Sequence, residues 1–416
     1  MNYIIIGSGA AGIQAARELR QRDPKGTIHV FSGDMGAYSR CMLHQYVSGE
    51  RNPARLRFVD PDFFERWDIR HHPECPVKAV CPREKTVATE KGVYPYDKLL
   101  VASGAVSRIP PTPGFAEAPN VFGFRDLRDA EAILLACQSG RRAFVVGTGL
   151  SGMDAAYGLI RRGLDVTVNG RSPRIIPRQS DETVSGLYET RFRQAGARLL
   201  LGQSVVRTVQ GEGGRITGLI MADGEEIPCD FVVAAAGVTP SAAFLNGSGI
   251  ATGKGIAVNE YLETSVPDIF AAGDVTGLSG TWASAALQGR TAARNMLGLR
   301  ERYKNETLAK NTMNFFGLPA MALGDVSAPI GSEEEIVWKD GGEYGRIVRR
   351  EGTIVSVQLA GNLDHGGIWE YLIRRGMGGD WSAAKLRHAS QSGFYGFSSD
   401  AGKKRIQSVW LEKHIV

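Results

Sequence analysis

The sequence predicts an α/β protein in which one unit of strand, glycine turn and helix occurs twice. The first copy is YIIIGSGAAG, beginning at Tyr3, and the second is AFVVGTGLSGMDAA, beginning at Ala143. In each copy an apolar run predicts a buried parallel strand, and a GxGxxG turn opens a helix, as in a Rossmann dinucleotide-binding fold. A single motif of this length is weak, but two copies at strand-to-helix junctions indicate two dinucleotides on one chain.

The three glycines of each turn have separate roles. The first permits the tight turn, the second lets the backbone approach a pyrophosphate, and the third lets helix and strand pack closely. The pyrophosphate then lies at the positive end of the helix. The residues expected to bind nucleotide are Gly7, Gly9, Ala10, Ala11 and Gly12 in the first turn, and Gly147, Gly149, Leu150, Ser151 and Gly152 in the second.

The first unit continues with a helix over 13–22 and a strand over 27–31, which complete a βαβ start. A Rossmann fold places an acid after this second strand to accept hydrogen bonds from ribose hydroxyls. Here the sequence is VFSGD, so Asp34 is a displaced candidate and Ser32 is its alternative. A loop and a helix are expected over 35–57, followed by a strand-rich stretch over 77–100.

Proline and glycine clusters divide the rest of the chain. The run YDKLLVASGAVSRIPPTPG over 96–114 predicts a strand, a turn and a rigid linker, so a domain boundary lies near Ile109. The second nucleotide fold then occupies 111–238. Residues 239–306 hold TSVPDIFAAGDVTG and a helix that begins near Trp282, and 307–416 hold strand-like and helical runs typical of an α+β domain.

Composition narrows the functional classes. The net charge of +5 is small for 416 residues and its basic residues are scattered, which excludes a nucleic-acid surface. No apolar run reaches the length of a membrane span, and the first strand follows Met1 too closely for a cleavable signal peptide. The five cysteines include no CxxC and no metal-ligand spacing, so we expect a cytoplasmic protein without structural disulfides or a bound metal.

These pieces, in this order, resemble the pyridine nucleotide-disulfide oxidoreductase family over about residues 1–306. YSRCML and WASAALQGRTAARNMLG most resemble its rubredoxin reductase, NADH oxidase and nitrite-reductase-like branch. The resemblance implies two Rossmann-like domains of the three-layer ββα type, the second inserted in the first. Residues 1–110 and 239–306 would bind FAD, 111–238 would bind NAD(P)H, and 307–416 would form a C-terminal α+β interface domain.

Individual residues take roles from the same resemblance. Asp274, after Gly273, would accept hydrogen bonds from the ribityl chain of FAD, and Arg40 would neutralise FAD phosphate charge. Val77 would contact the adenine through its backbone, and Trp282 would cover the flavin. The other expected cofactor-binding residues are Ala102, Ser103, Gly104 and Gly237.

The strand after the second glycine turn indicates which nicotinamide cofactor binds. An NADH-specific relative would have an acid where this chain has Gly170. Arg171 and Arg174 follow, and arginines bind a 2′-phosphate, so NADPH is favoured over NADH. Asp154 stands where the family has glutamate, close to flavin and nicotinamide.

Cys41 decides between the functions that remain open. It aligns with the single redox cysteine of the NADH oxidase, peroxidase and CoA-disulfide reductase branch, and a positive charge on Arg40 would lower its pKa. However, Met42 follows it instead of glycine, and Ala10 stands where the peroxidases have histidine. We therefore expect an FAD-dependent NAD(P)H oxidoreductase that reduces a small carrier, such as rubredoxin or another iron-sulfur protein.

Two alternatives remain. The first is a single-cysteine NAD(P)H oxidase or disulfide or persulfide reductase that uses Cys41. The second is a flavin electron-entry subunit of a larger redox complex. The sequence leaves open whether the chain forms a homodimer.

Overall fold

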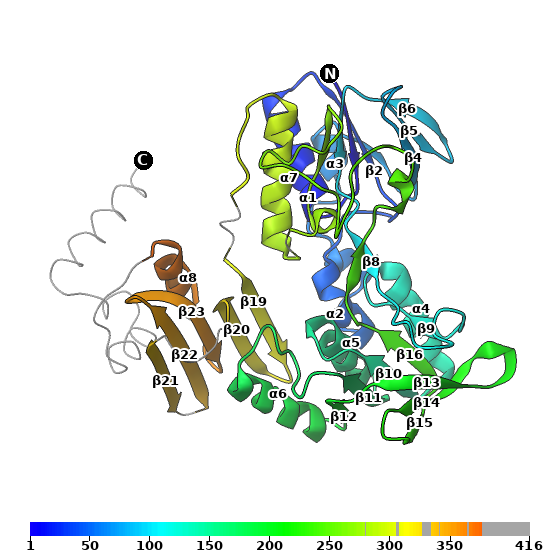
Figure 1. Ribbon diagram of the computed structural model, residues 1–416, viewed down its shortest axis with the longest axis vertical. Helices are drawn as coiled ribbons and strands as arrows, with labels where there is room; N and C mark the ends of the chain where they lie inside the picture. The colour runs from blue at the N-terminus through cyan, green and yellow to red at the C-terminus, as the bar shows by residue number, and fades with distance from the viewer. Residues whose placement is uncertain (279, 305–307, 327–333, 341, 364–365, 377–416) are drawn as a thin grey trace. The chain divides into compact units, whose positions relative to one another are not determined.

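The computed structural model describes residues 1–376 except 279, 305–307, 327–333, 341 and 364–365 (Figure 1). The chain divides into two compact units. The first combines Met1–Pro173 with Ala195–Thr307, and the second combines Arg174–Gln194 with Leu308–Val416. Among the described residues, no helix is both long enough and apolar enough to cross a membrane.

The first unit contains a five-stranded sheet in which every pair of neighbours is parallel. Its strands in spatial order are β18 (Ile269–Ala271), β7 (Lys98–Val101), β1 (Asn2–Ile6), β2 (Thr27–Phe31) and β3 (Arg70–His72). Helices α1 (Ala10–Arg22) and α7 (Trp282–Met296) lie side by side against this sheet (Figure 1). They approach so closely that a Cβ on Gly289 would lie 2.0 Å from the carbonyl oxygen of Ala11. Strands and helices from the two ends of the unit thus share one core.

The second parallel sheet repeats this plan within the same unit. Its strands in spatial order are β12 (Arg198–Leu201), β11 (Asp165–Gly170), β10 (Arg142–Val146), β16 (Phe231–Ala234) and β9 (Val121–Phe122). Helices α4 (Leu127–Ser139) and α5 (Leu150–Arg161) belong to this half. Strand β16 and the three central residues of β10 are buried, as expected for a parallel sheet covered on both faces.

Each parallel sheet is accompanied by a three-stranded antiparallel sheet. These are β4 (Val77–Cys81), β5 (Thr86–Thr89) and β6 (Gly92–Pro95) in the first half, and β13 (Val205–Gln210), β14 (Ile216–Met221) and β15 (Glu226–Pro228) in the second. The two halves are joined by a ribbon of β8 (Ala105–Ser107) and β17 (Val238–Pro240). The remaining short helices are η1 (Arg40–Met42), α2 (Leu43–Ser48), η2 (Pro53–Leu56), α3 (Phe63–Arg66), η3 (Glu212–Gly214), η4 (Ala243–Leu245) and η5 (Asp274–Thr276).

The second unit is built on an antiparallel sheet. Its strands in spatial order are β19 (Lys310–Phe315), β20 (Leu318–Gly324), β23 (Thr353–Ala360), β22 (Glu343–Arg350) and β21 (Glu334–Asp340). Helix α8 (Gly366–Arg374) packs on β20 and β23 and buries Trp369 completely. Helix α6 (Glu182–Gln194) belongs to the same unit, where the hydroxyl of Tyr188 donates to the carbonyl of Leu318 at 2.9 Å.

The predicted fold class is confirmed. The first helix begins at Ala10 rather than at residue 13, because Gly9 has an extended backbone and serves as the N-cap. The domain boundaries at 110, 238 and 306 stay predictions. Residues 174–194, expected inside the second nucleotide domain, group with the C-terminal segment in the division into compact units, and 377–416 lie outside the described residues.

A histidine and aromatic cluster lies between β2, β3 and β6. Nδ1 of His29 is 2.9 Å from Nε2 of His72, and the ring of His72 stacks on Phe31 with centroids 4.3 Å apart. Tyr94 meets both Phe31 and His72 edge-on. Burial and the neighbouring charge of His72 lower the pKa of His29 to about 4.

Replacing His29 with phenylalanine is expected to weaken the pH dependence of stability. Because the folded pKa of His29 lies below its ordinary value of 6.5, the unfolded chain binds the proton first, and stability is lost as the pH falls from about 6.5 to 4. Between pH 7.5 and 4.5 the melting temperature of His29→Phe should fall less than that of the parent; parallel curves would contradict this.

Candidate functional site

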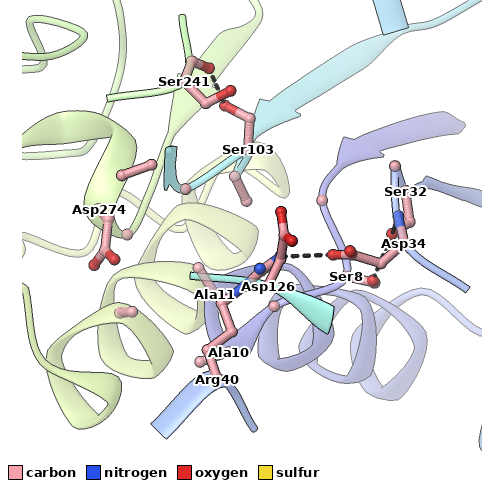
Figure 2. Close-up of a pocket in the computed structure, with 18 of the residues that line it drawn as sticks. Ser8, Ala10, Ala11, Ser32, Asp34, Arg40, Ser103, Asp126, Ser241 and Asp274 are labelled. Carbon is pink, nitrogen blue, oxygen red and sulfur yellow. Dashed lines mark hydrogen bonds and ion pairs between the residues drawn. The ribbon is translucent and has the colours of Figure 1, made fainter. Parts of the chain in front are cut away.

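A cavity of about 420 Å³ lies in the first half of the first unit. It is walled by the turn after β1, the end of β2, the turns after β7 and β18, and the start of α7 (Figure 2). Fifteen of the residues expected from the sequence line it: Gly7, Gly9, Ala10, Ala11, Ser32, Asp34, Arg40, Cys41, Val77, Ala102, Ser103, Gly104, Gly273, Asp274 and Trp282. Segments more than 200 residues apart in the sequence therefore converge on one space.

The first glycine turn leaves room for a ligand at one position only. Gly7 has φ +112°, and a Cβ there would lie 2.1 Å from the carbonyl oxygen of Ala102. A Cβ on Gly12 would lie 1.9 Å from the carbonyl oxygen of Gly7. A Cβ on Gly9, at the N-terminus of α1, would meet no protein atom within 4 Å. This open space before a helix N-terminus fits the pyrophosphate of FAD.

Polar groups around the cavity are already paired with one another. The hydroxyl of Ser103 points to Ser241 and donates to its carbonyl at 2.7 Å (Figure 2). The hydroxyl of Ser32 accepts from the backbone N–H of Asp34 at 3.0 Å. The carboxylate of Asp34 accepts from the guanidinium of Arg40 at 2.6 Å. The expected contacts of Ser32, Asp34 and Arg40 with FAD stay predictions, and each would add to or exchange with one of these bonds.

Arg125 is a cavity residue that the sequence did not reveal. Its guanidinium pairs with the carboxylate of Asp274 and also donates to the carbonyl of Ala105. Its backbone N–H donates to the carboxylate of Asp129 at 2.7 Å, at the start of α4. The sequence around Arg125, FRDLRDA, does not match a motif with a known spacing of residues. Arg125 reaches the cavity because β9, just before it in the chain, pairs with β16.

Cys41 lines the cavity and is accessible from it, although protein atoms crowd its thiol. Desolvation by these atoms and the nearby carboxylate of Asp154 raise the pKa of the thiol, while Arg125 acts in the opposite direction. The expectation that Arg40 lowers this pKa is wrong. The charge of Arg40 is paired with Asp34, and the desolvation of the thiol outweighs the remaining positive charge.

Asp154 lies beside His44 rather than in the cavity wall. Helix α2 packs on α5, and Nδ1 of His44 is 3.6 Å from Oδ1 of Asp154. The two helices are close because Gly158 has no side chain; a Cβ there would lie 2.9 Å from the carbonyl oxygen of His44. Burial raises the pKa of Asp154 to about 8 and lowers that of His44. At neutral pH this contact is therefore between two largely uncharged groups.

The second glycine turn repeats the geometry of the first. Gly147 has φ +127° and a Cβ there would lie 2.3 Å from the carbonyl oxygen of Ala235, while a Cβ on Gly152 would lie 1.9 Å from that of Gly147. A Cβ on Gly149 would meet nothing within 4 Å. Leu150 and Ser151 open α5 at this point. The arrangement fits a second pyrophosphate.

The other residues expected at the second nucleotide differ in their surroundings. Gly170 ends β11 and is buried, and Arg171 after it is exposed. Gly237 has φ +105° beside the guanidinium of Arg108. Arg174 belongs to the second unit, where it donates to the carbonyl of Pro177 at 3.0 Å and to the hydroxyl of Ser185 at 3.1 Å. Its expected role at a 2′-phosphate stays a prediction.

Comparison with known families agrees with this duplicated geometry. The model of the pyridine nucleotide-disulphide oxidoreductase family matches residues 1–289. The chain belongs to this family. As a family member it is an NAD(P)H oxidoreductase, and membership implies FAD and NAD(P)H as its cofactors.

Relatives of this oxidoreductase vary in length. It is 31% identical to the epsilon subunit of the NADH-dependent phenylglyoxylate dehydrogenase of Aromatoleum evansii, over 90% of this chain and 91% of that protein. It is also 31% identical to the nitrite reductase [NAD(P)H] of Bacillus subtilis (strain 168), over 87% of this chain but only 46% of the reductase. A ferredoxin reductase from Rhodopseudomonas palustris shares its fold, with a TM-score of 0.81 at 23% identity, over 92% and 96% of the two chains.

Replacing Asp154 with asparagine is expected to stabilise the protein in a pH-dependent manner. Because the folded pKa is raised, the unfolded chain ionises first, and parent stability is lost as the pH rises from about 4 to 8. Asparagine cannot ionise, so the gain should grow across this window to on the order of 2 kcal/mol and then level off. Denaturant titrations of parent and variant from pH 5 to 9 measure this gain in the free energy of unfolding. Asp165→Asn, at an exposed carboxyl, is the control and should give no such trend.

Proposed function

We propose that this oxidoreductase transfers electrons from NADPH through FAD to a small electron-carrier protein. The flavin supplies the electron-transfer chemistry when it is bound. The residues of the chain bind and orient the two dinucleotides through the paired glycine turns. The observation that most directly supports a protein acceptor is that large apolar side chains in the cavity wall are exposed.

Trp282 and Val106 are these exposed cavity residues. Trp282 is 49% exposed and Val106 is 51% exposed, although both line the space that fits FAD. The Trp282 ring is held edge-on against Phe58, with centroids 5.7 Å apart. Exposed aromatic side chains are typical anchors of protein interfaces. A carrier docked here would come close to the flavin without entering the cavity. The ferredoxin reductase that shares this fold is named for an acceptor of this kind, which supports the proposal.

The choice of NADPH rests on the end of β11. Gly170 provides no carboxylate to accept from a 2′-hydroxyl or to repel a 2′-phosphate. The guanidinium of Arg171 is exposed and has no hydrogen-bond or ion-pair partner among the described residues, so it is available to a phosphate. The relatives include an NADH-dependent enzyme as well as one that uses NAD(P)H. The preference for NADPH is therefore proposed for this chain alone.

A cysteine-dependent reductase is the second candidate. The exposure of Cys41 at the cavity favours it, whereas the raised pKa of the thiol disfavours it, because the thiolate is the nucleophile. Membership of a larger complex is compatible with the carrier proposal, since the phenylglyoxylate dehydrogenase relative is itself a subunit. The homodimer and the cytoplasmic location stay predictions.

Arg171→Ala is expected to raise the KM for NADPH about tenfold and to leave the KM for NADH nearly unchanged, because only the 2′-phosphate loses a charged partner. Steady-state reduction of a dye by each nucleotide measures both constants. Arg207→Ala, at another exposed arginine, is the matched control. Equal effects on the two nucleotides would contradict the proposed role of Arg171.

Trp282→Ala is expected to lower kcat/KM for a rubredoxin or ferredoxin acceptor about tenfold relative to kcat/KM for a small dye, both measured at equal FAD content, because only the protein acceptor needs the docking surface. Leu135→Ala, at an exposed leucine of α4, is the control.

Cys41→Ser separates the two candidate functions in the same assays. The carrier proposal expects no change with the carrier or the dye and no disulfide reductase activity in the parent. Disulfide reduction by the parent that is lost in Cys41→Ser would instead establish the cysteine enzyme.

A further inference from the structure

The end of β11 is closed to any side chain by a residue of the second glycine turn. A Cβ built on Gly170 would lie 2.5 Å from both Oγ1 and Cγ2 of Thr148, and 3.0 Å from its Cβ. The φ angle of Gly170 is outside the left-handed region, so backbone strain does not exclude a side chain there. The exclusion is a steric one between two side-chain positions.

Rotation of Thr148 does not relieve this contact. Its Cβ carries two heavy atoms, and both face position 170. Any staggered rotamer fills two of the three positions on Cβ, so at least one heavy atom always remains on the facing side. Thr148 is also only 5% exposed, which leaves its side chain little space to move elsewhere.

The backbones on both sides of the contact are fixed. The N–H of Gly147 donates to the carbonyl of Asn169 at 2.8 Å, which ties the glycine turn to the end of β11. The side-chain amide of Asn169 donates to the carbonyls of Leu200 and Gln203, and the N–H of Gln203 donates to the carbonyl of Gly170 at 3.2 Å. Neither the turn nor the strand end can therefore withdraw to admit a side chain at 170.

We propose that Thr148 restricts position 170 to glycine, so that a carboxylate is excluded from the end of β11 and the site stays compatible with a 2′-phosphorylated dinucleotide. This rests on the proposed function, in which the second turn binds NADPH. It adds that the preference depends on a pair of residues, Thr148 with Gly170, and that a single change at 170 does not reverse it. Arg171 attracts the 2′-phosphate, and Thr148 prevents its repulsion by keeping a carboxylate away from position 170.

A double-mutant cycle on the FAD-loaded protein tests this pair. Gly170→Asp is expected to lower the melting temperature by roughly 2–6 °C in the parent, because overpacking strains the contact. In the Thr148→Ala background, where both atoms at 2.5 Å are removed, less than half of this loss should remain. Gly170→Ala makes the same Cβ contact with one carbon if the aspartate variant does not fold. Gly186→Ala, whose Cβ meets nothing within 4 Å, is the control and should be independent of Thr148.

Nucleotide binding by the same variants gives the second readout. Calorimetry with adenosine 2′,5′-bisphosphate and with 5′-AMP reports the 2′-phosphate preference without turnover. Thr148→Ala should keep the parent preference, and Thr148→Ala with Gly170→Asp should reduce it at least tenfold. A Gly170→Asp variant that has the parent melting temperature and by itself reverses the preference would overturn the role of Thr148. A parent that binds neither probe would overturn the proposed nucleotide site instead.

Discussion

The close approach of backbone to backbone at the glycine turns is the constraint on which the rest of this structure depends. The carbonyl oxygen of Ala102 lies only 2.1 Å from where a Cβ of Gly7 would be, and that of Gly7 lies 1.9 Å from where a Cβ of Gly12 would be. These contacts draw β1, β7 and α1 together, and they direct the N-terminus of α1 into the cavity. Because the second half repeats the same contacts, both nucleotide sites follow from one steric rule.

Two arginines of the first cavity form ion pairs with cavity carboxylates. Arg40 pairs with Asp34, and Arg125 pairs with Asp274, so both of these cations already have an anion beside them. Such pairing limits the cost of burying charge. It also explains why Cys41 does not become an acidic thiol: the nearby cations are committed to carboxylates, and the desolvation of the thiol prevails.

Motifs that act through the local backbone were predictable, and contacts made by distant side chains were not. The glycine turns reveal themselves because their spacing is fixed by strand-to-helix geometry. The roles expected of Asp274 and Trp282 came from the resemblance to the family. Arg125 is brought to the cavity only by sheet pairing, and the contact between Thr148 and Gly170 needs the register of β10 on β11. The grouping of 174–194 with the C-terminal segment had no local signal either, because an amphipathic helix does not specify which sheet it covers.

The pairing of β7 with β18 also sets an order of events during synthesis. The two strands are hydrogen-bonded neighbours, yet the chain between them contains the entire second nucleotide half. The edge of β7 therefore stays unpaired for on the order of 10 seconds while that half is translated. An unpaired parallel edge is a template for association with other chains. The sheet of the first nucleotide half is thus completed only after the whole second half has been translated, although four of its five strands precede that half in the chain.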